Sequence, residues 1–198
     1  MIIKDWKKEV FTIPNLLSMF RLLLIPVYMV IYLNATTAAH YYISGAILAV
    51  SSLTDLVDGK IARHFNMQST LGQLLDPIAD KATQFTLTLC LAIKHNNLVL
   101  WIVMGLFVVK ETFQLIAMCV FYRKGKMLSG ALMSGKICTT VLFVSLIILV
   151  LMPYIPDTAV TIIAAVDGLF LLIAFADYVR TYAKQTSMIK DIPSEETV

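Results

Sequence analysis

Long apolar segments alternate with short polar ones along most of the chain. Six of the apolar segments are long enough for a helix to cross the ~30 Å hydrocarbon core of a bilayer. They cover residues 16–33, 41–63, 71–93, 98–122, 128–151 and 158–182. The polar connections between them are short enough to be turns. We therefore expect an all-α integral membrane protein with six transmembrane helices.

The two ends of the chain break this pattern. In residues 1–11, apolar side chains such as Trp6 alternate with charged ones such as Lys4, and no long apolar core follows the basic start. This arrangement favours a short N-terminal interfacial helix over a secretory signal, with a solvated tail as the alternative. Residues 185–198 form a polar C-terminal tail that we expect to be mobile. Because no repeat or second domain is indicated, we expect a single membrane-embedded domain at about residues 12–184.

The composition agrees with a membrane protein. The chain has 198 residues, of which 59% are hydrophobic and 15% charged, and its mean hydropathy is +0.80. These values lie outside the range of soluble domains. The formal net charge of +3 is too small to indicate a nucleic-acid partner. Cys90, Cys119 and Cys138 fall in apolar segments without metal-ligand spacing, so we interpret them as small buried hydrophobic residues.

The basic residues predict an orientation. In a six-helix arrangement, most lysines and arginines near the helix ends fall on one side of the membrane, and only Lys94 clearly falls on the other. Basic residues concentrate on the cytoplasmic side of membrane proteins. We therefore expect a multi-pass protein of the cell membrane, with both termini and the acidic stretch described next facing the cytoplasm.

Four aspartates stand out in the second and third apolar segments. Asp55 and Asp58 are three residues apart, and Asp76 and Asp80 are four apart, so each pair shares one face of a helix. Carboxylates that face each other repel at neutral pH unless cations lie between them. Hard divalent cations prefer oxygen ligands and are often held by a few carboxylates together with substrate phosphates. We therefore expect a site for Mg²⁺ or Mn²⁺.

Other residues near the aspartates suit a phosphate-binding site. Gly59 and Gly72 lack side chains, so a ligand or a neighbouring helix can approach the backbone there. Arg63 carries the planar guanidinium that grips phosphates. Arg21 interrupts the first apolar segment; it either snorkels to the surface or faces the acidic site, and we favour the second. Charged groups at membrane depth are costly and usually mark function.

The spacing from Asp55 to Asp80 is also recognisable. It reads D-x-x-D-G-x-x-A-R, then eight residues, then G-x-x-x-D-x-x-x-D. This pattern resembles the signature of the CDP-alcohol phosphatidyltransferase family, and the chain matches every fixed position, including Ala62. A looser resemblance extends from about Pro14 to Tyr182. Because the signature fixes both residue types and spacings, it is far more specific than a lone glycine motif.

The resemblance implies a reaction and a role for each signature residue. Enzymes of this family move the phosphatidyl group of CDP-diacylglycerol, or a related group of a CDP-alcohol, onto an acceptor alcohol and release CMP. By resemblance, Asp80 is the catalytic base, and all four aspartates hold the metal ions. The residues implied to bind the CDP substrate are Asn15, Gly59, Arg63, Ser69 and Gly72. For Asn15, a helix cap is the alternative role.

Looser features bear on the acceptor. Residues 13–21 and 74–81 are similar to bacterial phosphatidylglycerol phosphate synthases and to cardiolipin synthases of the CMP-forming type. We favour glycerol-3-phosphate as the acceptor, with phosphatidylglycerol as the alternative. By resemblance, Lys110 and Lys136 are candidates for binding the phosphate of the acceptor. Lys110 can instead form a structural charge pair with Glu111, and Lys136 can snorkel to the headgroups.

Two other classes of function stay open. Intramembrane carboxylates also line ion pathways, so a metal-ion transporter is the non-enzyme alternative, although the chain is short and has no inverted repeat. A membrane scaffold that retains the fold is the third class, and the intact signature argues against it. The expected partners are the lipid bilayer, CDP-diacylglycerol and an alcohol acceptor, without nucleic acid. Because members of the family are commonly homodimers, the resemblance also implies a homodimer.

Overall fold

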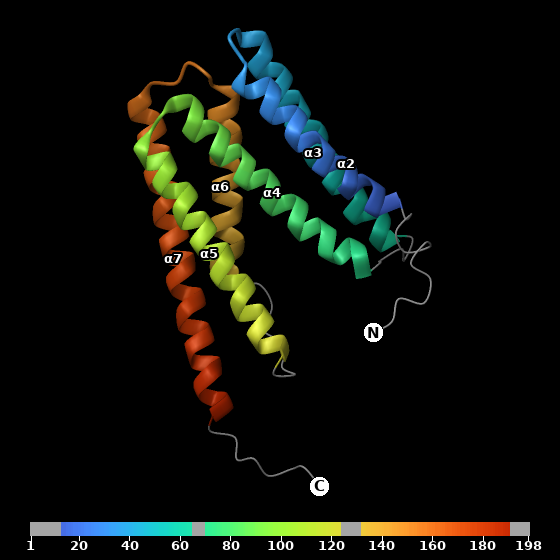
Figure 1. Cartoon of the computed structure of the whole chain (residues 1–198), viewed down its shortest axis with the longest axis vertical. Helices are drawn as coiled ribbons and strands as arrows, with labels where there is room; N and C mark the ends of the chain where they lie inside the picture. Colours follow the sequence, from blue (N-terminus) through green and yellow to red (C-terminus); the bar gives the residue numbers. More distant parts are fainter. Residues whose placement is uncertain (1–12, 65–69, 124–131, 191–198) are drawn as a thin grey trace. The chain divides into compact units, whose positions relative to one another are not determined.

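The computed structural model describes the backbone of residues 13–64, 70–123 and 132–190, and every regular element in these ranges is an α-helix. Side chains are described there except at 13–14, 56–64, 70–71, 73–74, 122–123 and 186–190. The helices are α2 (Ile13–Leu33), α3 (Ala38–His64), α4 (Thr70–His95), α5 (Leu98–Arg123), α6 (Met133–Leu151) and α7 (Asp157–Lys190), drawn in Figure 1. The all-α class is confirmed, whereas the interfacial helix expected at residues 1–11 lies outside the described residues.

Local chemistry accounts for the helix ends. α4 ends at His95, and the next residue, Asn96, has a φ of 46°, a left-handed conformation that asparagine tolerates. After α2, the side-chain amide of Asn34 donates to a main-chain carbonyl of the last helical turn at 2.8 Å. α7 begins at Asp157, whose negative charge is favourable in a first turn. α7 also continues to Lys190, through the first part of the predicted polar tail.

The helices group into two compact units. The first comprises Met1–Asn97 and Leu146–Asp157, and therefore α2, α3, α4 and the last residues of α6. The second comprises Leu98–Ser145 and Thr158–Val198, and therefore α5, most of α6 and nearly all of α7. The single domain expected from the sequence stays a prediction.

In the first unit, α2 packs against both α3 and α4, as Figure 1 shows for the blue and green helices. The rings of Tyr28 and Tyr32 stack with centroids 5.5 Å apart, and Tyr41 meets Tyr32 edge-on at 5.6 Å. Nζ of Lys94 donates to the carbonyl of Ala35 at 2.6 Å, which ties the end of α4 to the turn between α2 and α3. The polar residues of the sequence motif lie away from this end, in the second half of α3 and the first half of α4.

In the second unit, aromatic side chains of α5 and α7 form one cluster of the core. The ring of Tyr182 lies 6.0 Å from that of Phe121 and 5.7 Å from that of Tyr178, measured between centroids. Gly135 of α6 lies directly against Tyr178, because a Cβ at residue 135 would overlap the phenol oxygen. A small residue is therefore required where α6 passes Tyr178.

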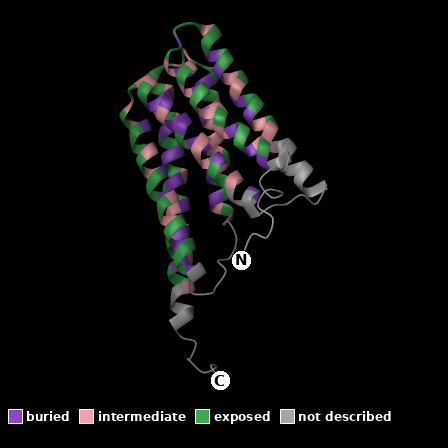
Figure 2. Cartoon of the chain, turned by 45° about the vertical axis from the view of Figure 1, so that its right-hand side comes forward, coloured by how far each residue is buried: buried purple, intermediate pink, exposed green. Residues whose placement is uncertain are grey.

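Several long helices with apolar side chains on their outer surface indicate a multi-pass membrane protein. Among the described residues, four helices are long and apolar enough to cross a membrane, at Asn15–Leu33, Leu98–Phe121, Met133–Leu151 and Asp157–Gln185. Exposed positions recur along the helices (Figure 2), and many hold large apolar side chains, such as Leu23 on α2, Leu115 on α5 and Ile162 on α7. α3 and α4, with 27 and 26 residues, are also long, but they are not among these four helices and they carry the acidic stretch.

The cysteines agree with expectation in part. Cys90 and Cys138 are buried, as expected, and no disulfide joins any of the three cysteines. Cys119 is exposed, so the expectation that it would be buried is wrong. Cys119 lies among exposed residues of α5, such as Met118 and Val120, on a surface of the helix that the rest of its unit leaves uncovered.

Candidate functional site

A polar stripe on α2 begins the candidate site. Asn15, Ser18 and Arg21 follow each other at intervals of three residues and therefore share one face of the helix. All three are buried, with 0%, 0% and 3% of their surface exposed. Buried polar groups in an apolar helix need polar partners. The stripe therefore marks the face of α2 that meets polar groups of α3 and α4.

Arg21 brings together carboxylates from both neighbouring helices. Its Nη1 lies 2.5 Å from Oδ1 of Asp55 on α3 and 2.9 Å from Oδ1 of Asp80 on α4. Its Nη2 lies 3.7 Å from Oδ1 of Asp76 on α4. Three of the four aspartates predicted as metal ligands thus converge on one guanidinium. The expectation that Arg21 faces the acidic site, rather than the membrane surface, is confirmed.

Ser18 is the member of the site that we did not predict. Its hydroxyl donates to Oδ1 of Asp76 at 2.5 Å. The signal for its role was present in the sequence, since Ser18 lies three residues from both Asn15 and Arg21. The stripe shows that the three residues share a face, but the sequence alone does not show which helix covers that face.

At this site a buried cation, Arg21, contacts carboxylates that are partly exposed to solvent. The side chain of Arg21 is only 4% exposed, whereas those of Asp55, Asp76 and Asp80 are 41%, 45% and 51% exposed. A buried guanidinium is favourable only when carboxylates or other acceptors surround it. The carboxylates therefore compensate the charge of Arg21 on one side and remain accessible to a ligand on the other.

The donor set suits a divalent cation. Carboxylate oxygens are the ligands that Mg²⁺ and Mn²⁺ prefer, and partly exposed ones leave room for phosphate oxygens and water. Among the described side chains, no three acidic, histidine or cysteine groups are arranged to hold a metal directly. Asp55, Asp76 and Asp80 instead meet through the guanidinium of Arg21. The three carboxylates are therefore suitable ligands for a divalent cation, and the guanidinium of Arg21 lies between them.

The other predicted site residues fall in three groups. Gly72 is buried on α4, one turn before Asp76, and Asn15 is buried near the start of α2. Asp58, Gly59 and Arg63 belong to the last turns of α3, and their side chains lie outside the described residues. Ser69 lies in residues 65–69, which are also outside them. Their predicted roles stay predictions.

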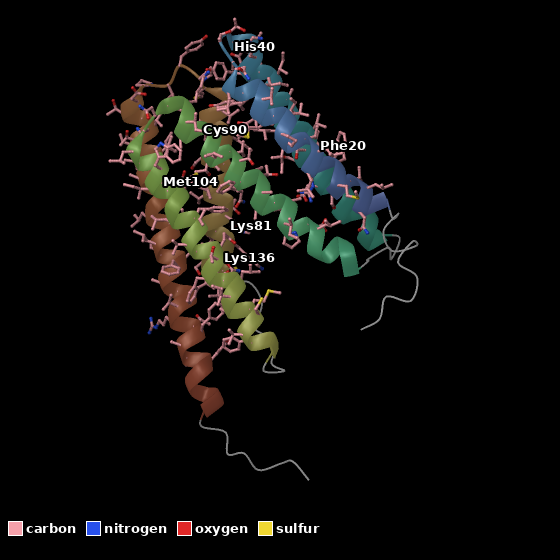
Figure 3. The ribbon with its side chains drawn as sticks, in the orientation of Figure 1. Phe20, His40, Lys81, Cys90, Met104 and Lys136 are labelled. Atoms are coloured by element: carbon pink, nitrogen blue, oxygen red, sulfur yellow. The ribbon has the colours of Figure 1, made fainter. Side chains whose placement is uncertain are left out.

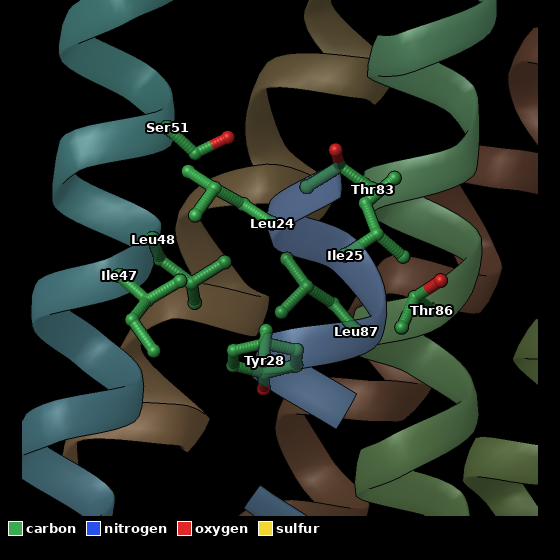
Figure 4. Close-up of a pocket in the computed structure, with 9 residues that line it drawn as sticks. All are labelled: Leu24, Ile25, Tyr28, Ile47, Leu48, Ser51, Thr83, Thr86 and Leu87. Carbon is green, nitrogen blue, oxygen red and sulfur yellow. The ribbon is translucent and has the colours of Figure 1, made fainter. Parts of the chain in front are cut away.

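An apolar hollow adjoins the acidic cluster. Figure 4 shows its lining, to which α2, α3 and α4 contribute in equal measure. The lining residues are Leu24, Ile25, Tyr28, Ile47, Leu48, Ser51, Thr83, Thr86 and Leu87. On α2 the hollow begins three residues after Arg21, and on α4 three residues after Asp80. At 1.5 Å of rise per residue, this places it about 5 Å further along the helices than the charges.

The second unit holds a separate polar cluster. Nζ of Lys110 lies 2.7 Å from Oε1 of Glu111 and 5.8 Å from the ring centroid of Tyr178. The hydroxyl of Ser134 donates to Oδ2 of Asp177 at 2.5 Å. The side chain of Lys110 is 2% exposed, which matches the alternative of a structural charge pair.

Lys136, the second candidate for binding the acceptor, has a different environment. It lies on α6, where Figure 3 labels it, and its side chain is exposed. Figure 3 also labels Phe20 and Lys81, which lie next to Arg21 on α2 and next to Asp80 on α4. Of the two lysines, only Lys136 presents an accessible charge.

Comparisons with known proteins agree with the sequence motif. A model of the family described as CDP-alcohol phosphatidyltransferase matches residues 11–176. The chain is 42% identical over 92 residues (46% of the chain) to a "Cardiolipin synthase (CMP-forming) / mitochondrial hydrolase fusion protein" of Schizosaccharomyces pombe. It is 42% identical over 80 residues (40% of the chain) to a "Putative cardiolipin synthase" of Mycobacterium tuberculosis.

A relative whose name states a different activity is similar to a comparable extent. The chain is 39% identical over 71 residues (36% of the chain) to a "CDP-diacylglycerol--glycerol-3-phosphate 3-phosphatidyltransferase" of Salmonella typhimurium. The chain spans 14%, 37% and 38% of the length of these three curated relatives, in the order given.

Proposed function

The chain belongs to the CDP-alcohol phosphatidyltransferase family, and we propose that it transfers the phosphatidyl group of CDP-diacylglycerol to the hydroxyl of glycerol-3-phosphate and releases CMP. The observation that carries this proposal is the convergence of Asp55, Asp76 and Asp80 on Arg21, with each carboxylate about half exposed. Such a cluster suits a substrate that brings phosphates and metal ions together.

The metal ligands in this proposal are Asp55, Asp76 and Asp80, joined by Asp58 on the strength of the family signature. When bound, Mg²⁺ or Mn²⁺ offsets negative charge on the pyrophosphate and on the departing CMP. Ser18 fixes the orientation of Asp76 through the hydrogen bond from its hydroxyl. The number of ions, two, follows from the resemblance.

Proton transfer falls to Asp80. Its side chain is the most exposed of the three carboxylates, at 51%, so an alcohol can reach it. As the hydroxyl oxygen forms a bond to the phosphorus of the phosphatidyl group, its proton passes to the carboxylate of Asp80. The bond between that phosphorus and the bridging oxygen breaks, and CMP leaves with the electron pair. The Asp80 proton then passes to water.

The apolar hollow supports a lipid substrate. It lies about one helical turn beyond the acidic cluster and is lined mainly by leucine, isoleucine and tyrosine. A substrate with a charged pyrophosphate and apolar acyl chains needs a polar region and an apolar region next to each other. We therefore propose that the phosphates bind at the cluster and that the acyl chains leave it toward this apolar side.

The acceptor site is proposed on Lys136. Its exposed ammonium can pair with the phosphate of glycerol-3-phosphate. Lys110, the other candidate, would have to leave Glu111 before it could bind a phosphate. Phosphatidylglycerol is the second candidate acceptor, because two of the three relatives described above are named cardiolipin synthases.

The membrane arrangement is also part of the proposal. We propose that α3 and α4 cross the membrane together with the four more apolar helices, that residues 1–11 form an interfacial helix, and that the chain forms one membrane-embedded domain. The termini and acidic cluster then face the cytoplasm, as the distribution of basic residues predicts. By resemblance to the family, the protein is a homodimer.

Release of CMP by the purified chain tests the reaction and the acceptor. The assay uses CDP-diacylglycerol and Mg²⁺ with either glycerol-3-phosphate or phosphatidylglycerol. We expect CMP with glycerol-3-phosphate, and an increased KM for this acceptor in Lys136→Gln. Release with phosphatidylglycerol alone would make the protein a cardiolipin synthase. No release with either acceptor, together with no binding of CDP-diacylglycerol, would contradict the enzyme and favour the transporter.

A further inference from the structure

Arg21 occupies the space between two carboxylates that the proposed function assigns to metal. A single nitrogen, Nη1, lies 2.5 Å from Oδ1 of Asp55 and 2.9 Å from Oδ1 of Asp80. The side chain is 4% exposed and is held between α3 and α4 rather than in solvent. Arg21 therefore places a cation at the centre of the acidic cluster.

A divalent ion and this nitrogen compete for the same oxygens. Mg²⁺ binds oxygen ligands at about 2.0–2.1 Å. An ion held by both Asp55 and Asp80 would need the space between them that Nη1 of Arg21 now occupies. Two cations cannot share that space, and their repulsion is strong in a partly buried site.

From this geometry we propose that Arg21 is a resident counter-cation of the metal-free protein, which divalent ions displace from Asp55 and Asp80 when they bind. The proposal rests on the proposed function, since that function assigns the carboxylates to metal. Arg21 then keeps the acidic cluster folded before metal arrives and lowers the affinity for metal. Ser18 is not displaced, because its hydroxyl is neutral and donates to Asp76 rather than to Asp55 or Asp80.

The opposite role makes a different prediction. If Arg21 only oriented the carboxylates for metal, its loss would weaken metal binding, as happens when groups that support metal ligands are removed. Displacement predicts tighter metal binding, because the hydrogen bonds from Nη1 no longer have to be broken. The sign of the change in metal affinity therefore separates the two roles without any measurement of turnover.

Binding of Mn²⁺ to the purified full chain, without CDP substrate, is the direct test. Electron paramagnetic resonance of free Mn²⁺ gives the dissociation constant for the wild type and for Arg21→Gln. Because a charge-assisted hydrogen bond contributes ~1.5–3 kcal/mol, we expect Arg21→Gln to bind Mn²⁺ about tenfold more tightly or better. Arg21→Lys keeps the charge without the planar fork and should lie between the two. The control Arg180→Gln, at an exposed position of α7, should not change the affinity.

Thermal unfolding gives a second readout that follows from the same competition. Without metal, Arg21→Gln leaves the carboxylates uncompensated, so it should unfold at a lower temperature than the wild type. Mg²⁺ should then raise the unfolding temperature of Arg21→Gln by more than it raises that of the wild type, because tighter binding to the folded state stabilises more. A variant that is folded in Mg²⁺ and unfolds on chelation, under conditions where the wild type stays folded, gives the same support.

Several results would overturn the proposal. One is Mn²⁺ binding by both Arg21 variants that is equal to or weaker than that of the wild type. Another is an equal rise of the unfolding temperature with Mg²⁺ in Arg21→Gln and in the wild type. The third is an Arg21→Gln chain that does not fold even in Mg²⁺, together with Arg21→Lys that binds Mn²⁺ no more tightly than the wild type. A wild type that binds Mn²⁺ but releases no CMP contradicts the proposed reaction and leaves the role of Arg21 to be decided by the variants. A wild type that binds no Mn²⁺ overturns both.

Discussion

Arg21 and Asp80 are 59 residues apart in the sequence, yet Nη1 of Arg21 donates to Oδ1 of Asp80 at 2.9 Å. This contact makes α2 part of a site whose signature residues all belong to α3, α4 and the residues between them. α2 therefore contributes a charged group to the acidic cluster and not only an apolar surface. Ser18, one turn before Arg21, extends that contribution to Asp76.

Removing the hydroxyl of Ser18 should weaken the site without unfolding the protein. In Ser18→Ala, Asp76 loses a hydrogen bond of 2.5 Å and with it one constraint on its orientation. Groups that orient metal ligands typically matter by 10–100-fold, so the Mg²⁺ concentration for half-maximal CMP release should rise about tenfold. Ser18→Thr keeps the hydroxyl and should stay close to the wild type.

Ser44→Ala is the matched control for Ser18. Ser44 is also fully buried, but its hydroxyl donates to the carbonyl of His40 on the same helix at 2.9 Å. Its loss should leave the Mg²⁺ dependence unchanged. If Ser18→Ala and Ser44→Ala behave alike, Ser18 has no specific role at the acidic cluster.

Lys110 and Glu111 should behave as a structural pair. Lys110→Met leaves Glu111 with no ammonium 2.7 Å away, and breaking a buried ion pair costs about 3 kcal/mol or more. We expect a clear loss of thermal stability in Lys110→Met and recovery of most of it in Lys110→Met/Glu111→Gln. The double variant should keep the KM for glycerol-3-phosphate. A folded double variant with a strongly increased KM would instead place Lys110 in the acceptor site.

Substitution by alanine should change the stability in opposite directions at two glycines of the second unit. In Gly135→Ala, the new Cβ overlaps the phenol of the buried Tyr178, so the free energy of unfolding should fall by about 1–3 kcal/mol. In Gly105→Ala, the new Cβ meets nothing within 4 Å, and helix propensity favours alanine by up to ~1 kcal/mol. Thermal unfolding in one detergent compares them. Equal effects would contradict the close packing of α6 on Tyr178.

Much of the fold could be predicted from the apolar pattern, because each apolar segment became one helix. α5 begins at Leu98 as predicted, since the polar residues before it form the turn. α7 is longer than predicted, because its polar last turns have helix-favouring residues but no apolar signal. Cys119 was expected to be buried, but an almost wholly apolar helix gives no periodicity to show which side faces outward.

The site could be predicted where the signature fixes residue types, and less well where tertiary packing decides. The meeting of Asp55 with Asp76 and Asp80 followed from helical spacing and a short connection. The contact of α2 with these carboxylates did not follow, because contacts between distant helices depend on how the helices pack. The buried environment of Lys110 is of the same kind, since Tyr178 comes from another helix.

The central claim is that the acidic cluster on Arg21 is a catalytic site with Asp80 as its base, and CMP release by Asp80→Asn tests it most directly. The wild type is compared with Asp80→Asn and with Asp157→Asn, whose side chain is 87% exposed at the start of α7. We predict that Asp80→Asn loses at least about 10²-fold in CMP release, since general base catalysis contributes this much, yet still binds Mn²⁺ through the other aspartates. Asp157→Asn should be unaffected. CMP release by Asp80→Asn at the rate of the wild type would contradict the account.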